Sequence, residues 1–331
     1  MMSFTMTVPK LGIDISKKTF DVALIRDPET MKIKQRQFSN TPDGFQALQT
    51  WLAKQGVRQV HAVMEATGAY GLDLAEHLHG AGHLVSIVNP AQIKAFGQSQ
   101  LQRNKTDRAD ATLIARFGWS HNPTPWTPPE PEQRELQSLV RHLDDLIEQR
   151  TQVSNRLSEG RLTKTVRESW EEILQALNER IEEVKRQINR HFDDHPRLKR
   201  QRELLDSIPG IGPETAARLL AEMPQLGEFD SARAAAAHTG LTPKRHQSGI
   251  SINAPARISK IGNSRVRYAL YLPAMAALRS SKEFKELAAR LTERGKKKMQ
   301  IIAAAMHKLV RIAHGVLKNQ RAYDPDYAAA D

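Results

Sequence analysis

A proline-rich segment, NPTPWTPPEPEQ (residues 122–133), divides the sequence into parts with different patterns. Five of its twelve residues are proline. Because proline fixes φ and lacks a backbone donor, neither a helix interior nor a central strand can run through the segment. Before it, short apolar runs alternate with helical patterns, and after it apolar residues recur every three or four positions. The segment therefore predicts an extended linker between an α/β domain and a mainly helical remainder.

The part before the linker predicts an α/β domain. Three strands, at VPKLGID, FDVALIRD and MKIKQRQFS, are expected to form an antiparallel meander. A helix over residues 42–56, a strand ending at Glu65, a helix over residues 72–82, a strand at LVSIVNP and a helix capped by Thr106 follow. This is the element order of a ribonuclease H-like domain, which we expect over residues 1–128.

The part after the linker predicts two long helices and then a third domain. In residues 129–195 the apolar repeat is typical of a coiled coil or a helical hairpin, and also of two helices in a larger bundle. The second helix is predicted to begin at Ser169, where Glu172 completes a capping box. We expect this segment to be a spacer or an oligomer contact, and residues 196–331 to form a mostly helical C-terminal domain.

The C-terminal domain opens with SIPGIGPETAARLLAEM (residues 207–223), which has the signature of a helix-hairpin-helix. Gly210 and Gly212 would allow a tight turn whose backbone N–H groups, with the helix N-terminus, hold a backbone phosphate. The same pattern also occurs as a plain packing motif. Because a basic segment follows directly, we favour a contact with nucleic acid.

The positive charge is concentrated in one segment. The formal net charge is +12, and no Asp or Glu occurs from Ser231 to Lys282. Solvated basic faces usually interleave acids, so the complete absence of acids predicts a surface for a polyanion. The nine cations of this segment are Arg233, Lys244, Arg245, Arg257, Lys260, Arg265, Arg267, Arg279 and Lys282.

The composition excludes other classes of protein. The chain has no cysteine, which rules out disulfides and thiolate metal sites and fits a reducing compartment. The start, MMSFTMTVPK, lacks the regions of a signal peptide, and no apolar run approaches the length of a membrane span. We therefore expect a cytoplasmic, nucleoid-associated protein with no membrane partner.

Four carboxylates are candidates for a metal site. Asp107 and Asp110 lie three residues apart in RNKTDRADA, on one face of a predicted helix, while Asp14 and Glu65 end predicted strands. In an open α/β sheet such positions converge at the carboxyl ends of the strands. Their oxygens suit Mg²⁺ or Mn²⁺, and two such ions about 4 Å apart can hold the attacking and leaving oxygens of a phosphodiester. Three nearby cations suit a phosphate backbone: Arg103, Lys105 and Arg108.

The acid-free segment also contains a candidate nucleophile. Ser248 follows Lys244 and Arg245, and guanidinium groups can stabilise the charge of a pentavalent phosphorane. A serine before glycine is also common in turns, so the position alone assigns no role. Three other serines compete with it on chemical grounds: Ser251, Ser259 and Ser264.

Seven segments together resemble the DEDD insertion-sequence transposases. They occur in the order of that family, and the resemblance extends over about residues 10–320, nearly the whole chain. Each segment alone is a weak signal, and the set is specific. The segments are GIDISKKTFDVAL, MEATGAY, VSIVNPAQIKAFGQS, RNKTDRADA, SIPGIGPETAARLLAEM, GLTPKRHQSG and ARISKIGNSRVRYALYLPAM.

The resemblance implies roles for particular residues. A RuvC-like N-terminal domain would carry Asp14, Glu65, Asp107 and Asp110 as metal ligands, and a C-terminal transposase domain would carry Ser248 as the recombinase serine. The resemblance further implies a noncoding bridge RNA that pairs with donor and target DNA. It also implies a homo-oligomer, a dimer to tetramer, in which two protomers share each active site.

Other functions are compatible with parts of the sequence. A RuvC-like junction nuclease would use the same acids with metal-bound water as nucleophile and would not need the serine. An actin-like or sugar-kinase ATPase is suggested by LGIDISKKTFDVAL, but the second phosphate loop and the adenosine-binding glycine motif of that fold are missing. A non-catalytic nucleic-acid scaffold would gain nothing from the four acids. We therefore expect a transposase that cleaves and rejoins DNA through a phosphoserine, with the junction nuclease as the alternative.

Overall fold

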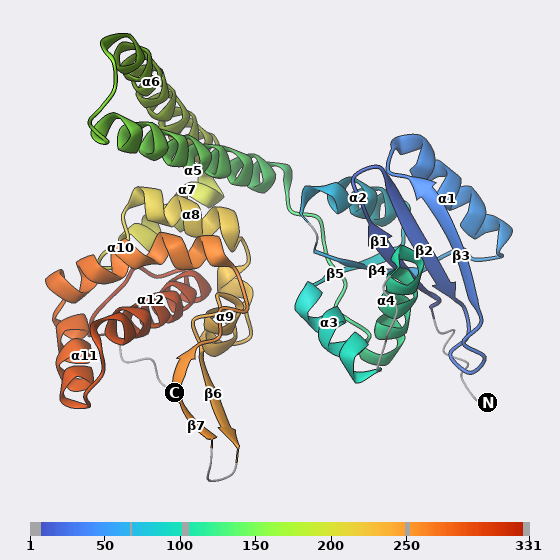
Figure 1. Ribbon diagram of the computed structural model, residues 1–331. Coiled ribbons are helices and arrows are strands. Elements are labelled where there is room, and N and C mark those ends of the chain that lie inside the picture. Colours follow the sequence, from blue (N-terminus) through green and yellow to red (C-terminus); the bar gives the residue numbers. More distant parts are fainter. Residues whose placement is uncertain (1–7, 67, 101–105, 249–251, 327–331) are drawn as a thin grey trace. The chain divides into compact units, whose positions relative to one another are not determined.

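The protein consists of two compact units, residues 1–129 and 130–331 (Figure 1). The boundary falls inside the proline-rich segment, where the sequence predicts a linker. The computed structural model describes residues 8–66, 68–100, 106–248 and 252–326, with the backbone alone given at 69, 244–248 and 252–256. None of the helices in these ranges combines the length and the hydropathy that a bilayer crossing needs.

The first unit is built on a five-stranded sheet with the strand order β3-β2-β1-β4-β5. The first three strands along the chain pair antiparallel, whereas β1, β4 and β5 pair in parallel. The predicted antiparallel meander and the two later strands are confirmed. The strands are β1 (Lys10–Ile15), β2 (Thr19–Ile25), β3 (Ile33–Ser39), β4 (His61–Glu65) and β5 (Leu84–Val88).

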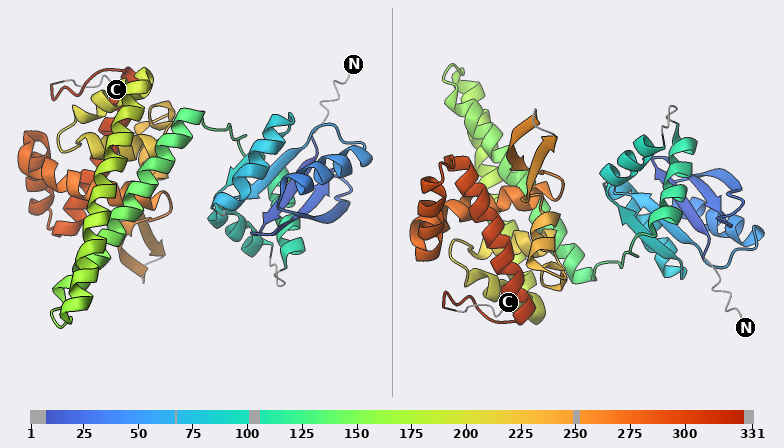
Figure 2. Two further views of the ribbon diagram at one scale, coloured as in Figure 1. Left: turned by 90° about the horizontal axis from the view of Figure 1, so that it is seen from above. Right: turned by 90° about the horizontal axis from the view of Figure 1, so that it is seen from below.

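Helices cover both faces of this sheet (Figure 2). On one face lie α1 (Pro42–Lys54) and α2 (Leu72–Gly80), which is preceded by the short helix η1 (Ala69–Gly71). On the other face lie α3 (Pro90–Ser99) and α4 (Asp107–His121).

The helix α3 is absent from the sequence prediction, which ended the preceding strand at Asn89 and Pro90. In the structure Asn89 caps this helix, because its Oδ1 accepts a hydrogen bond from the backbone N–H of Ala91 at 2.9 Å. Pro90 occupies the first turn, where its missing N–H costs nothing. The Asn-Pro pair therefore starts a helix here instead of ending a strand.

Strand alternation sends successive side chains of β1 to opposite faces. Leu11 and Ile13 are fully buried in the cluster that includes residues of α1 and α2. Gly12 and Asp14 lie on the other face, against α4. This parity decides which residues of the sheet can meet the acids of α4.

A buried polar network fastens the end of α4 to the sheet. Lys10 Nζ lies 2.7 Å from His61 Nδ1 and 2.6 Å from Asn122 Oδ1, and His61 Nε2 lies 2.7 Å from Ser86 Oγ. Because lysine can only donate, His61 Nδ1 accepts and its Nε2–H donates to Ser86. The hydrogen bonds therefore run in one direction, from Lys10 through His61 to Ser86.

The linker continues this network along the edge strand β5. Ser86 Oγ lies within donating distance of the carbonyl oxygens of Pro123 (3.0 Å) and Thr124 (2.8 Å). The backbone N–H of Trp126 donates to the carbonyl of Val85 at 2.6 Å. The first part of the predicted linker is therefore bound to the sheet.

The second unit is mostly helical and carries an antiparallel strand hairpin (Figure 1). Its helices and strands in chain order are α5 (Pro131–Ser158), α6 (Lys164–Asp194), α7 (Pro196–Asp206), α8 (Pro213–Glu222), η2 (Leu226–Glu228), α9 (Ala232–His238), β6 (Pro243–Ser248), β7 (Ile252–Ile258), α10 (Ser264–Ser280), α11 (Lys282–Glu293) and α12 (Lys298–Asn319).

The helices α5 and α6 form a hairpin whose apolar seam is buried within the chain. Near its base the seam belongs to the same core cluster as residues of α7 to α12. Residues 130–195 and 196–331 therefore share one core, although the sequence pattern changes between them. The buried seam residues of this shared core are Leu136, Val140, Leu143 and Leu146 of α5 and Ile181, Val184, Ile188 and Phe192 of α6.

The start of α6 differs from the sequence prediction. The helix begins at Lys164, one turn or more before the predicted start at Ser169, so that prediction is wrong. Nothing in residues 164–168 breaks a helix, and Lys164 Nζ lies 3.8 Å from the Glu168 carboxylate at the favourable i,i+4 spacing. Ser169 consequently lies inside the helix, where no capping box can form.

Candidate functional site

The site begins with the close packing of α4 on β1. A Cβ atom placed on Gly12 would overlap the carbonyl oxygen of Ala111 and the backbone nitrogen of Ala115. Only glycine allows the two backbones to approach this closely. The sequence GID therefore places Asp14, two residues further along β1, beside the N-terminal end of α4.

Four predicted acids converge at this end of the sheet. β1 and β4 are parallel neighbours with Ile13 opposite Met64, so Asp14 and Glu65 follow side by side on the two strands. Asp107 and Asp110 occupy the first turn of α4. Three elements thus bring together carboxylates that are far apart in the sequence.

The N-terminus of α4 suits these carboxylates. Thr106 caps the helix as predicted, with its Oγ1 accepting a hydrogen bond from the backbone N–H of Ala109 at 3.2 Å. The helix dipole gives this end a partial positive charge, which favours negative side chains in the first turn. It offsets part of the repulsion between Asp107 and Asp110.

The other carboxylates affect the ionisation of Asp14. Burial raises the pKa of Asp14 to about 6, with further contributions from Asp110, Asp107, Glu65 and Asp21. Each neighbouring negative charge disfavours ionisation of Asp14. A divalent cation would reverse this effect, and carboxylate oxygens are the ligands that Mg²⁺ and Mn²⁺ prefer.

The acids do not form a finished metal site. Within the described ranges, no three Asp, Glu, His or Cys side chains stand in a geometry that could hold a metal ion. The charge, the burial and the ligand type of the cluster fit a divalent cation. The spacing of the described side chains does not fit one.

A fifth acid, Asp21, belongs to the cluster and is missing from the sequence prediction. It lies opposite Asp14 in the β1–β2 register and its side chain is 5% exposed. Gln37 Nε2 donates to Asp21 Oδ2 at 2.8 Å. The short turn between β1 and β2 fixes this pairing, so the length of the hairpin was the signal that could have identified Asp21.

One predicted phosphate-binding cation lies beside the cluster. Arg108 is 71% exposed, and its Nε lies 3.9 Å from Asp21 Oδ1. Because the guanidinium is exposed and lies this far from the buried carboxylate, it can still bind another anion. Arg103 and Lys105, which were predicted with it, lie outside the described residues.

The candidate nucleophile lies in the second unit. Ser248 is the last residue of β6, and its backbone pairs with Ile252 of β7. Lys244 stands opposite Arg257 in the same hairpin, and the register shifts at Arg245, between Lys244 and His246. For residues 244–248 the structure describes the backbone alone.

The competing serines differ in their surroundings. Ser259 Oγ lies 3.3 Å from the carbonyl oxygen of Gly240 and also accepts from the N–H of Ile261, which is typical of a turn residue. Ser264 is exposed at the start of α10. Ser251 lies outside the described residues.

The predicted cations of the acid-free segment also differ. Arg267 donates through Nη1 to the carbonyl oxygens of Thr239 (2.8 Å) and Gly262 (3.1 Å), which joins two loops. Arg257 and Lys260 are exposed. Arg267 has a structural contact, and the other two are open to a ligand.

A buried carboxylate, Glu222, organises this region. Arg141 donates to it through Nε (2.7 Å) and Nη2 (3.1 Å), and Asn263 Nδ2 donates at 3.1 Å. Burial alone would raise the pKa of Glu222, but the hydrogen bonds from Arg141 and Asn263 outweigh it, so the pKa is lowered. Arg265 lies at the edge of this cluster, with Nε 4.0 Å from Glu222 Oε1.

The two predicted turn glycines have separate surroundings. Gly210 has φ +87°, and a Cβ there would overlap the carbonyl of Pro273 and touch Ala277 of α10. Gly212, the N-cap of α8, has open space around its Cβ position. Gly210 is therefore required for packing, whereas only Gly212 is sterically open to a ligand.

Comparisons with known proteins identify the family. A transposase model of the DEDD type found in IS110 elements matches residues 11–165, and the model "Transposase IS116/IS110/IS902 family" matches residues 202–289. The first match contains Asp14, Glu65, Asp107 and Asp110, and the second contains Ser248.

Relatives match over most of the chain. A pilin gene-inverting protein of Moraxella bovis is 34% identical over 321 residues, which cover 95% of this chain and 97% of the relative. A probable family 20 transposase of Pseudomonas aeruginosa is 26% identical, covering 97% of this chain and 100% of the relative. The transposase for insertion sequence element IS1111A of Coxiella burnetii is 28% identical, covering 82% and 78%. Together with the two family models, this similarity shows that the chain belongs to the IS116/IS110/IS902 family of insertion-sequence transposases.

Proposed function

We propose that this transposase cleaves and rejoins DNA strands through a phosphoserine intermediate, with Ser248 as the nucleophile and the acids of the first unit as metal ligands. The observation that carries the proposal is the convergence of carboxylates around Asp14 at the N-terminus of α4. The strand order of the first unit, with an antiparallel meander followed by parallel strands, supports a ribonuclease H-like domain.

The four acids Asp14, Glu65, Asp107 and Asp110 would hold Mg²⁺ or Mn²⁺. Bound ions of this type activate a nucleophilic oxygen and neutralise charge on a phosphodiester. The close packing of α4 on β1 at Gly12 positions the ligands, and the helix dipole of α4 stabilises their charge. Arg108 at the edge of the cluster can bind a neighbouring phosphate.

The serine step conserves the phosphodiester energy. Ser248 Oγ would attack the phosphorus, lose its proton and displace a strand hydroxyl, so one phosphate ester bond forms as another breaks. Attack by the hydroxyl of a second strand would then restore the phosphodiester and release the serine. Arg245 and Lys244, which precede the serine on β6, would stabilise the charge of the phosphorane.

The name of one relative supports rejoining over simple hydrolysis. The Moraxella bovis protein is described as gene-inverting. Inverting a gene requires that the cut segment be joined again in the opposite orientation. A junction nuclease that uses water as nucleophile releases its strands, so this alternative is not favoured.

We propose DNA and RNA as partners of the second unit. The acid-free segment supports a polyanion surface, and the open Gly212 at the start of α8 supports a phosphate contact of the helix-hairpin-helix kind. The family resemblance adds a noncoding bridge RNA that pairs with donor and target DNA. RNA recovered with the purified protein, and mapped to DNA flanking its gene, would support this partner; recovery of unrelated RNA only would oppose it.

We also propose that the distal part of the α5–α6 hairpin joins protomers. Val166 and Ile173 of α6 are 43% and 42% exposed, unlike the buried residues at the base of the hairpin. They are seven residues apart and so share one face of the helix. Replacing both with serine should lower the molecular mass in sedimentation without lowering the melting temperature. An unchanged mass would exclude this face as the contact.

A trapping experiment tests the nucleophile. On a nicked suicide substrate, wild type should form a protein–DNA adduct that survives denaturation, and Ser248→Ala should form none. A control, Ser264→Ala, should form the adduct normally, because this exposed serine takes no part in the proposed reaction. No adduct in wild type, or an adduct in Ser248→Ala, would refute Ser248 as nucleophile.

A second experiment tests the acids. Asp14→Asn, Glu65→Gln, Asp107→Asn and Asp110→Asn should each abolish strand cleavage while leaving DNA binding largely intact. Excess chelator should have the same effect on wild type, and Mg²⁺ or Mn²⁺ should restore activity. Cleavage by these variants, or cleavage in chelator, would contradict the proposed metal site.

A further inference from the structure

The outward face of α10 is unusual for the surface of a helical unit. Tyr268 is 78% exposed and Leu272 is 67% exposed, which makes them the two most exposed large apolar side chains in the described part of the chain. The two family models and the acid cluster give these two residues no role. Because they are one turn apart, they form a single apolar patch.

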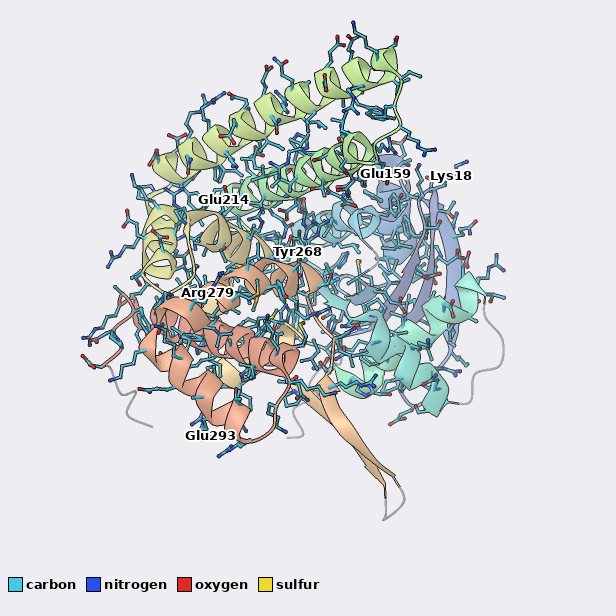
Figure 3. The ribbon with its side chains drawn as sticks, turned by 60° about the vertical axis from the view of Figure 1, so that its left-hand side comes forward. Lys18, Glu159, Glu214, Tyr268, Arg279 and Glu293 are labelled. Carbon is cyan, nitrogen blue, oxygen red and sulfur yellow. The ribbon has the colours of Figure 1, made fainter. Side chains whose placement is uncertain are left out.

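Two arginines extend this patch along the helix. Arg265, Tyr268, Leu272 and Arg279 follow one another in steps of three, four and seven residues, which places them on one face of α10. Figure 3 shows Tyr268 and Arg279 on this helix. From Arg265 to Arg279 the face is about 21 Å long at 1.5 Å per residue. We call these four residues the α10 stripe.

The helix that carries the stripe is held firmly. Asn263 caps it, with Oδ1 accepting from the N–H groups of Arg265 (2.9 Å) and Val266 (3.2 Å). On the opposite side, Gly210 allows close packing against Pro273 and Ala277. The stripe is therefore a rigid surface, and its exposure does not come from a loosely packed helix.

The charge around the stripe selects its ligand. The whole helix lies in the segment from Ser231 to Lys282, which contains no acid. The carboxylate of Glu222 is buried and accepts hydrogen bonds from Arg141 and Asn263, and Arg265 Nε lies 4.0 Å from it at the edge of this cluster. An aromatic and an aliphatic side chain between two arginines, on a helix that carries no acid, match a nucleic-acid strand better than a protein surface.

We propose that the α10 stripe binds an unpaired stretch of nucleic acid, with a base stacked on Tyr268 against Leu272 and phosphates bound by Arg265 and Arg279. The inference rests on the proposed function for its class of substrate, and it names a binding site that the cleavage chemistry does not require. A duplex hides the faces of its bases, so the stripe should prefer unpaired nucleotides. DNA and RNA share this chemistry.

The experiment uses the full-length protein and oligonucleotides that contain 2-aminopurine, whose fluorescence is quenched when it stacks. Single-stranded DNA, single-stranded RNA and duplex DNA of equal length are compared. Tyr268→Ala should weaken binding to single strands by roughly 5- to 100-fold and abolish the added quenching. Tyr268→Phe keeps the ring and should bind like wild type. Met299→Ala, which removes another exposed apolar side chain (61% exposed), should have no effect.

Salt dependence separates stacking from charge. Arg265→Ala and Arg279→Ala should each lower the slope of log affinity against log salt by about 0.7 on single strands, whereas Tyr268→Ala should leave the slope unchanged. A stronger loss on RNA than on DNA would identify RNA as the source of the unpaired strand, and the reverse would identify DNA. Either preference supports the stripe as the site.

Three results would overturn the inference. Wild-type affinity and quenching in Tyr268→Ala would show that no base stacks there. An equal loss of affinity for duplex and single strands in Tyr268→Ala would show that the stripe does not recognise unpaired bases. If Tyr268→Ala bound nucleic acid like wild type but had a lower molecular mass in sedimentation, the stripe would be a contact between proteins. None of these results touches the adduct or the metal dependence of cleavage, so the proposed function would stand or fall separately.

Discussion

Gly12 of β1 and Ala115 of α4 approach so closely that no side chain fits between the two backbones. This contact sets the distance between the strand that carries Asp14 and the helix that carries Asp107 and Asp110. A residue without chemistry of its own therefore controls the geometry of the acid cluster.

Gly12→Ala should displace α4 from the sheet. The added methyl group would overlap backbone atoms that cannot move as a side chain would, so we expect a loss of about 1–3 kcal/mol in the free energy of unfolding. Strand cleavage should fall together with stability. Urea unfolding measures the first effect and a cleavage assay the second.

Gly80→Ala is the matched control, because its Cβ would meet no atom within 4 Å. Equal stability of Gly12→Ala and wild type would contradict the close contact.

Divalent cations should stabilise the wild-type protein and not Asp14→Asn. Without a cation, the substitution removes a partly buried charge that four other carboxylates repel, so the melting temperature should rise. With Mg²⁺ or Mn²⁺, wild type should gain stability by binding, while the variant lacks a ligand. Thermal unfolding with and without the metal measures both effects. A variant that melts lower than wild type without metal would show that repulsion does not dominate at Asp14.

The buried network at His61 should make stability depend on pH. Burial, together with the positive charge of Lys10, lowers the pKa of His61 to about 4, below its ordinary value of 6.5. Between these two values the unfolded chain takes up a proton that the folded chain does not, so stability falls as the pH falls. The loss begins near pH 6.5, ends near pH 4 and amounts to at most about 3 kcal/mol.

The variant His61→Gln isolates this effect. It should be less stable than wild type at pH 7.5, and the difference between the two should shrink as the pH approaches 5. Asp14 and His83 also titrate in or near this range, and their contributions cancel when the two proteins are compared at the same pH. Urea midpoints across the range give the measurement. A constant difference between the proteins would mean that His61 titrates normally.

Removing the carboxylate of Glu222 should destabilise the second unit. Glu222→Gln leaves Arg141 without its charged partner in a half-buried position, and we expect a loss of about 2 kcal/mol or more. Glu214→Gln is the control, because Glu214 is 54% exposed and its ion pairs with Lys185 and Arg218 are worth little. Chemical unfolding of both variants tests the contrast. Similar small losses in both would mean that the buried pair adds no stability.

Much of the first unit could be predicted from the sequence because its signals are local. The apolar alternation gave the strands, and Thr106 marked the start of α4. Helix α3 was missed because Asn89 and Pro90 serve equally well to end a strand or to begin a helix. Asp21 was missed because its place opposite Asp14 depends on how β1 and β2 pair, and the pattern of each strand alone does not give this register.

The second unit was harder to predict because its interactions are long-range. The repeat in α5 and α6 gave the helices but not their partner, and the core that they share with α7 to α12 depends on residues more than a hundred positions away. Glu222 had no recognisable signal, since its partners come from distant parts of the chain, Arg141 from α5 and Asn263 from the N-cap of α10. The start of α6 was misplaced because Ser169 and Glu172 match a capping motif in a stretch where the helix had already begun.

The hydrogen bonds between the linker and β5 also bear on aggregation. The outer edge of a sheet offers unpaired backbone groups to any other extended chain, which makes it a template for fibrous assembly. Here Trp126 and the residues before it occupy the β5 edge, while Lys34 and Arg36 place charges on the β3 edge. Charged edge residues deter a second strand, and a bound linker blocks one physically. If the linker were released, the β5 edge would be open, and a protein that folds correctly at synthesis could still be lost later to insoluble aggregates.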